Sequence, residues 1–126
     1  MIKLSAILVG RYATQASDGW GVAGTFRQIK LSRLARNGFQ SCVYLLFTDV
    51  KPGDRTMLNM VIANPDMDDE ELWSQAAILQ PTPGDLCAEV VWEPADWGIR
   101  AAGQYEARFY NGDTILDVAV IRVTKG

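Results

Sequence analysis

Carboxylates are the side chains of this chain whose spacing most suggests a chemical role. Residues 66–71 read Asp-Met-Asp-Asp-Glu-Glu, so that Asp66, Asp68 and Glu70 alternate along the backbone. A loop could present these three hard oxygen ligands on one side, as calcium requires. The run lacks the glycine and the closing glutamate of an EF-hand loop, so the simpler interpretation is a solvated connection or an acidic helix start. Asp66, Asp68 and Glu70 are the candidate metal ligands.

A basic segment supplies the second group of candidates. Arg27, Lys30, Arg33 and Arg36 make up four of the 12 lysines and arginines in the chain. Such a segment suits an acidic protein, a phosphate group or the acidic run of a second copy. The simpler interpretation is a solvated strand edge or loop, where basic side chains deter edge-to-edge aggregation. Arg33 and Arg36 are candidate residues of a partner surface.

Tryptophan suggests a third possibility, because β-sandwiches can offer aromatic platforms to sugars. Trp20 and Trp92 fall on the apolar faces of their expected strands and belong to the expected core. Trp97 lies in an expected loop with Arg100 and is the best candidate for an exposed platform. The alternative is a tryptophan that covers the open end of the core. Trp97 and Arg100 are the candidate residues of a ligand surface.

Other catalytic chemistry lacks its usual residues. The chain has no histidine, which excludes Ser-His-Asp and Cys-His catalysis as usually built. Glu89 and Glu93 share a strand face, but an outward polar face is the expected explanation. Cys42 and Cys87 fall opposite the core-facing residues of their strands, so we expect free thiols with no activating neighbour. We predict a protein that is not an enzyme and holds no cofactor.

Composition limits the class of partner. The chain has 126 residues, a net charge of -3 and a sequence pI of about 4.8. This length fits one domain over residues 1–126, and the acidic balance argues against nucleic acid or an anionic membrane as partner. The first apolar run is too short to span a membrane and has no cleavage-site context. The expected location is the cytoplasm.

The elements that must position these residues are strands. Short apolar runs punctuated by Gly, Pro and Asp predict strands at residues 3–12, 20–31, 39–50, 55–63, 72–80, 86–93, 103–110 and 114–123. Residues 70–79 also fit a short helix, and residues 32–38 fit a loop or one helical turn. We expect the first two strands to pair as a hairpin, and the last two to pair around Asn111-Gly112. About eight strands predict an all-β antiparallel sandwich, Greek-key in topology and either immunoglobulin-like or jelly-roll-like.

Three sequence features carry a family resemblance. An apolar strand leads into Asp18-Gly19-Trp20 and Gly24-Thr25-Phe26-Arg27-Gln28-Ile29; a central strand ends in Ala63-Asn64-Pro65-Asp66; and the last hairpin begins Ala102-Gly103-Gln104-Tyr105. The chain resembles a family of short bacterial proteins known only as a domain of unknown function, with an antiparallel β-sandwich fold. The resemblance implies the fold and implies no activity or catalytic residue.

The last strand is apolar on both faces. Leu116, Val118 and Val120 lie on one side of it, and Ile115, Ala119 and Ile121 lie on the other. A covering loop or barrel-like closure explains this pattern, and so does a face that contacts another chain. Leu116, Val118 and Val120 are therefore candidate residues of a homodimer surface.

These observations favour a non-catalytic binding or assembly module whose partner is a second copy or another protein. The alternative is a sandwich that binds a sugar or other small molecule, with calcium at residues 66–71.

Overall fold

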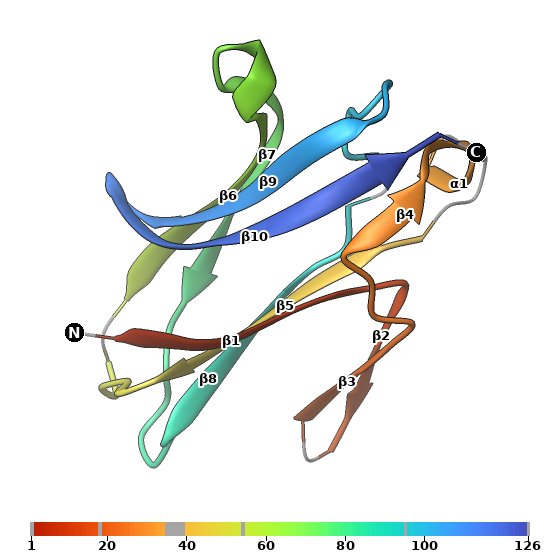
Figure 1. The fold of residues 1–126 in the computed structure, drawn as a ribbon. Helices are drawn as coiled ribbons and strands as arrows, with labels where there is room; N and C mark the ends of the chain where they lie inside the picture. The colour runs from red at the N-terminus through yellow and green to blue at the C-terminus, as the bar shows by residue number, and fades with distance from the viewer. Residues whose placement is uncertain (1, 18, 35–39, 54, 95, 126) are drawn as a thin grey trace.

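Two β-sheets face each other in the computed structural model, which describes residues 2–17, 19–34, 40–53, 55–94 and 96–125 (Figure 1). The five-stranded sheet has the order β4-β10-β9-β6-β7, and the three-stranded sheet has the order β1-β5-β8. Strands β2 and β3 form a separate hairpin. The strands are β1 (Lys3–Gly10), β2 (Tyr12–Ala16), β3 (Gly19–Ala23), β4 (Gln28–Lys30), β5 (Cys42–Thr48), β6 (Thr56–Asn64), β7 (Glu70–Leu79), β8 (Cys87–Trp92), β9 (Gly103–Asn111) and β10 (Thr114–Thr124).

The predicted all-β sandwich is confirmed, and its two sheets together hold eight of the described strands. Strand pairing is antiparallel throughout these strands except between β4 and β10, which run parallel. The segment 70–79 is a strand and not a helix. The described segments contain two short helical turns, which are α1 (Leu31–Leu34) and the 3-10 turn η1 (Pro65–Met67). The helical alternative for the segment after residue 31 is thus confirmed for α1, while residues 35–39 lie outside the described part.

The core lies between the two sheets and is built from alternate residues of each. In β5, Val43, Leu45 and Phe47 are fully buried, and Met60 and Ile62 of β6 are fully buried in the opposite sheet. Burying a side chain of this size contributes about 1.5–3 kcal/mol. The period of two along both strands places these residues on the same internal side.

The first strand pairs differently from the sequence-based prediction. The hairpin expected between the strands at 3–12 and 20–31 is wrong, because β1 pairs with the central strand β5. The N-terminal hairpin is β2–β3, after the chain turns at Arg11. A Cβ atom at Gly10 would lie 2.7 Å from Cγ1 of Val22, so only glycine permits this close crossing. Pairing with β5 places Val9 in the core at 1% exposure.

The β2–β3 hairpin lies beside the outer face of the three-stranded sheet (Figure 1). A Cβ atom at Gly19 would lie 3.2 Å from Oε1 of Glu89. The Tyr44 hydroxyl donates a hydrogen bond to Glu89, and Cys42 is fully buried on the same face. Burial, followed by this hydrogen bond, raises the pKa of Tyr44. Cys42 and Tyr44, on the outward face of β5, are thus buried within the chain.

The two cysteines should differ sharply in reactivity. Both are free thiols, as predicted; Cys42 is buried and Cys87 is exposed. Burial raises the pKa of the Cys42 thiol, and a protonated, inaccessible thiol is a poor nucleophile. We expect an aromatic disulfide reagent to modify Cys87 rapidly in the native protein and Cys42 only after unfolding. Fast modification of both thiols under native conditions would contradict the burial of Cys42.

The predicted hairpin between the last two strands, β9 and β10, is confirmed. Its two loop residues begin one position later than the predicted Asn111-Gly112 pair. Asn111 pairs with Thr114, which leaves Gly112 and Asp113 as the loop residues. Gly112 has φ +57°, a conformation that favours glycine at the first central position of a tight hairpin turn.

A β-bulge explains part of the two-faced apolarity of β10. The register shifts between Ile115 and Asp117, so Leu116 turns toward the core while Ile115 stays exposed. Leu116 is therefore partly buried core and not free surface. Val118 is half-buried and Val120 is 43% exposed on the outer face of the sheet. Two of the three predicted surface residues remain there.

None of the helices in the described segments is long and apolar enough to cross a membrane.

Candidate functional site

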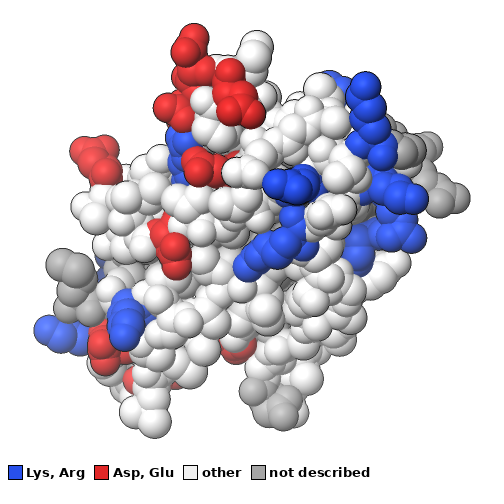
Figure 2. Space-filling view, viewed as in Figure 1, with Lys and Arg blue, Asp and Glu red and all other residues white. Residues whose placement is uncertain are grey.

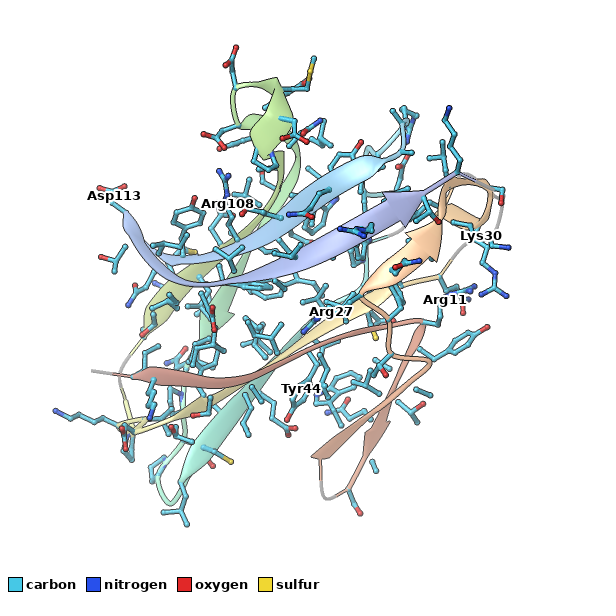
Figure 3. All side chains as sticks on the ribbon, viewed as in Figure 1. Arg11, Arg27, Lys30, Tyr44, Arg108 and Asp113 are labelled. Carbon is cyan, nitrogen blue, oxygen red and sulfur yellow. The ribbon has the colours of Figure 1, made fainter. Side chains whose placement is uncertain are left out.

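A pocket of about 600 Å³ opens beside β4, at the edge of the five-stranded sheet. Among the described residues, its charged lining is Arg11, Lys30 and Arg33, with no acidic side chain. Lysine and arginine gather on this side of the molecule, whereas acidic side chains gather at another corner (Figure 2). Arg11 and Lys30 project at the same end of the sheet (Figure 3). The pocket therefore has a positive potential suited to an anionic group.

Strand β4 and helix α1 place two of these cations. Lys30 ends β4, where it pairs with Thr124 of β10. Arg33 follows within the single helical turn α1. Both side chains are exposed, and neither forms an ion pair with any described residue. Their charges are available to a ligand.

Arg11 reaches the pocket from the turn between β1 and β2. Its backbone N–H donates to the Ala23 carbonyl at 3.1 Å, and its Nε donates to the Gln40 carbonyl at 2.9 Å. Gly24 has φ +69°, and a Cβ atom there would lie 3.1 Å from Cβ and Cγ of Arg11. The glycine thus lets the arginine stem pack against the backbone. These bonds fix Arg11 before a ligand arrives, which lowers the entropy cost of binding.

The pocket also has an apolar wall. Phe26 is half-buried and Ile29 is 6% exposed, and both line the pocket. The Phe26 backbone N–H donates to the Val9 carbonyl at 2.9 Å. Its ring stacks on Trp97 with 5.9 Å between centroids and 29° between planes. Fixed cations beside an aromatic wall can hold an anionic group carried on an apolar or peptide-like body.

Trp97 is not an exposed platform; that prediction is wrong. It is 1% exposed, and its Nε1 donates to Oγ of Ser41 at 2.7 Å. The Ser41 hydroxyl in turn donates to the Pro94 carbonyl at 2.7 Å. A large indole buries well once its single N–H has a partner, which Ser41 supplies. The alternative interpretation, a tryptophan that closes the end of the core, is the one observed.

Arg100 is exposed as predicted, but it does not line the pocket. Its guanidinium forms a two-pronged ion pair with Asp96, with Nη1–Oδ1 at 3.0 Å and Nη2–Oδ2 at 2.8 Å. The Gly98 N–H also donates to Oδ1 of Asp96. Trp97 and Arg100 are close in sequence, but Trp97 packs in the core and Arg100 forms an ion pair on the surface.

The ion pair between Asp96 and Arg100 predicts how the titration of Asp96 and the stability of the fold depend on pH. The hydrogen bond from Arg100, followed by that from the Gly98 N–H, lowers the pKa of Asp96 from 3.8 to about 2. Because the folded-state pKa is lowered, the stabilisation is complete above the unfolded value and is lost as pH falls toward 2. Carboxyl ¹³C NMR should show Asp96 titrating near the lower value, and Arg100→Gln should move the midpoint back toward 3.8. An unchanged midpoint in the variant would contradict the assignment to Arg100.

The acidic run supports a turn and not a metal centre. Asn64 caps η1 by accepting a hydrogen bond from the Asp66 N–H at 3.0 Å. Asp69 pairs with Arg108 of β9 at 2.6 Å, and this bond is the leading cause that raises the pKa of Arg108. No group of three or more Asp, Glu or Cys side chains suited to a metal ion occurs in the described segments. Asp66, Asp68 and Glu70 are therefore not brought together as calcium ligands.

Sequence reasoning found part of the pocket. Arg33 was a candidate and lines it, whereas Arg36 falls outside the described residues. Arg11 and Phe26 were missed as site residues. They reach the same pocket only because the end of β1 crosses the end of β3, which the sequence does not display. Gly21 and Gly24, inside an expected strand, were the local signals of a bulge or a close backbone approach, and Gly24 is the one that meets Arg11.

Comparison with known proteins supports the fold alone. No protein-family model matches the chain, and no curated protein sequence matches it. The chain is similar to the crystal structure of an immunoglobulin-like protein from Pseudomonas aeruginosa, with a TM-score of 0.54 and 14% identity over 98% of this chain and 97% of the other. This likeness is consistent with the all-β sandwich that the sequence predicts. Membership of the domain-of-unknown-function family that the sequence resembles is not shown.

Proposed function

We propose that this protein is a non-catalytic protein-binding module whose β4-side pocket receives an acidic segment of a partner protein. The observation that carries the proposal is one pocket of about 600 Å³ whose described lining has three cations, an aromatic wall and no acidic residue. Carboxylates accept bidentate hydrogen bonds from arginine, and neighbouring apolar side chains of a peptide can pack on Phe26. Such a pocket selects its partner by charge and by one or two apolar anchors.

A protein partner fits the site better than a sugar. The sugar alternative relied on Trp97 as an exposed ring, and Trp97 is buried behind Phe26. The pocket lies at a sheet edge with two exposed, flexible cations, Lys30 and Arg33. Exposed cations of this kind steer an acidic partner and raise its association rate more than they raise affinity.

Non-catalytic action is supported by the chemistry of the available groups. The chain has no histidine to serve as general base. Cys42 lies outside the pocket lining, and its pKa is raised by burial. The pocket side chains can bind and orient an anion, but they include no nucleophile paired with a base.

Fluorescence anisotropy with a labelled peptide of alternating glutamate and phenylalanine tests this function. The wild-type chain should bind it, and the counterpart with lysine in place of glutamate should not bind. Lys30→Glu combined with Arg33→Glu should raise the dissociation constant at least about tenfold, equivalent to about 1.4 kcal/mol. Binding should weaken with added salt.

The matched control is Lys51→Glu combined with Arg55→Glu, which changes net charge equally away from the pocket. This variant should bind the peptide as the wild type does. Equal loss in both double variants would contradict the pocket and indicate general charge attraction. Inorganic phosphate that displaced the peptide at equal concentration would indicate a small-anion site and overturn the protein partner.

A further inference from the structure

Strand β7 forms one edge of the five-stranded sheet, far in strand order from β4. It is ten residues long, and its ladder in the described part of the chain is with β6 alone. An edge strand presents unpaired backbone N–H and C=O groups that can pair with another extended strand. The opposite edge, β4, has three residues and is flanked by Lys30 and Arg33. Of the two edges of this sheet in the described part of the chain, β7 is therefore the long one.

The second half of β7 lacks the charged residues and prolines that usually protect an edge strand against pairing with another chain. Residues 74–79 contain no charged residue and no proline. Ser74, Gln75, Ala76 and Ile78 are exposed, and Ser74 and Ala76 are small. A Cβ atom at Gly98 would lie 2.6 Å from the Leu72 carbonyl oxygen, so the loop that meets β7 does so near the beginning of the strand. No described strand pairs with the remainder of this edge.

The two ends of β7 carry opposite charges. Glu70 and Glu71 begin the strand and are exposed. Arg55 lies at the other end, because it precedes the β6 residue that pairs with Leu79. Lys51 lies there too, since its loop donates a backbone hydrogen bond to the segment that follows β7. None of these four charged side chains forms an ion pair with another described residue.

We propose that β7 is a self-association surface on which two copies pair antiparallel, edge to edge, about a two-fold axis. An antiparallel pair places the acidic beginning of each strand beside the basic end of the other, so both ends attract. Residues opposite each other share a face in an antiparallel pair, so an axis at Ala76 sets Ser74 against Ile78. The two sheets join into one continuous sheet. This surface is independent of the pocket beside β4.

Sedimentation velocity of the full chain at rising concentration tests the proposal. We expect the mass to rise from 13.9 kDa toward twice that value at high micromolar concentration. Ala76→Lys sets two lysines against each other at the axis and should raise the dissociation constant of the dimer at least about tenfold. The matched control is Ile115→Lys, which changes an exposed apolar residue of the same sheet away from β7. It should leave the dimer intact.

A charge-swap pair tests the antiparallel geometry. Glu70→Lys with Glu71→Lys should be monomeric alone, and so should Lys51→Glu with Arg55→Glu, because each sets like charges together at both ends. An equal mixture of the two variants should form a heterodimer. A wild-type chain that stays monomeric at several hundred micromolar would overturn the proposal. So would an Ala76→Lys variant as dimeric as the wild type, or charge-swap variants that fail to recover association on mixing.

Discussion

Replacing Trp97 with alanine is expected to lower the free energy of unfolding by about 3–5 kcal/mol. The indole is 1% exposed, stacks on Phe26 and donates its only N–H to Ser41. Its removal leaves a cavity at the end of the core and takes away the support of the pocket wall. The same variant should therefore also weaken binding of the acidic peptide. Chemical denaturation and peptide anisotropy measure the two effects.

A comparison variant separates stability from binding. Leu58→Ala removes a side chain that is 1% exposed in the same core but does not line the pocket. It should cost about 2–5 kcal/mol and leave the affinity of the folded protein unchanged. Two variants with equal losses of affinity would contradict a specific link from Trp97 through Phe26 to the pocket.

Gly98→Ala is expected to destabilise the chain by about 3 kcal/mol or more, from two costs that act together. Gly98 has φ +75°, and the left-handed conformation costs other residues about 1–2 kcal/mol. The new Cβ atom would also lie 2.6 Å from the Leu72 carbonyl oxygen and 3.2 Å from its Cβ. The Leu72 carbonyl belongs to the backbone and cannot rotate away as a flexible side chain could. The loop around Gly98 or strand β7 must therefore move to relieve the contact. Thermal and urea unfolding measure the loss.

Gly84 provides the matched control for this steric argument. It has φ +93°, and a Cβ atom there would meet nothing within 4 Å. Gly84→Ala should carry only the conformational cost of about 1–2 kcal/mol. Equal destabilisation by the two alanine variants would show that the contact with Leu72 contributes nothing.

Local patterns predicted the C-terminal half of the fold well. The Asn111-Gly112 pair and the runs on either side of it define β9 and β10 from neighbouring residues alone. The N-terminal half depends on distant partners. β1 is equally suited to a hairpin with the next apolar run and to the central strand β5, and only the larger burial beside β5 decides between them.

The candidate site was harder to predict for the same reason. Lys30 and Arg33 belong to one basic segment that the sequence displays plainly, but Arg11 joins them only because the chain turns between β1 and β2. Trp97 lies in a loop, where the sequence leaves an exposed platform and a cover for the core both open, and the hydrogen bond to Ser41 that buries it spans 56 residues. Contacts between residues so far apart leave no periodic signal in a single sequence.

The most direct test of the pocket is ¹H–¹⁵N NMR during titration with the glutamate–phenylalanine peptide. The proposed function predicts that the largest amide shifts fall at Gly24, Thr25, Phe26 and the residues of β4 and α1, and that Lys30→Glu with Arg33→Glu abolishes them. Shifts confined to other surfaces, or no saturable shifts near β4, would contradict a binding site in this pocket.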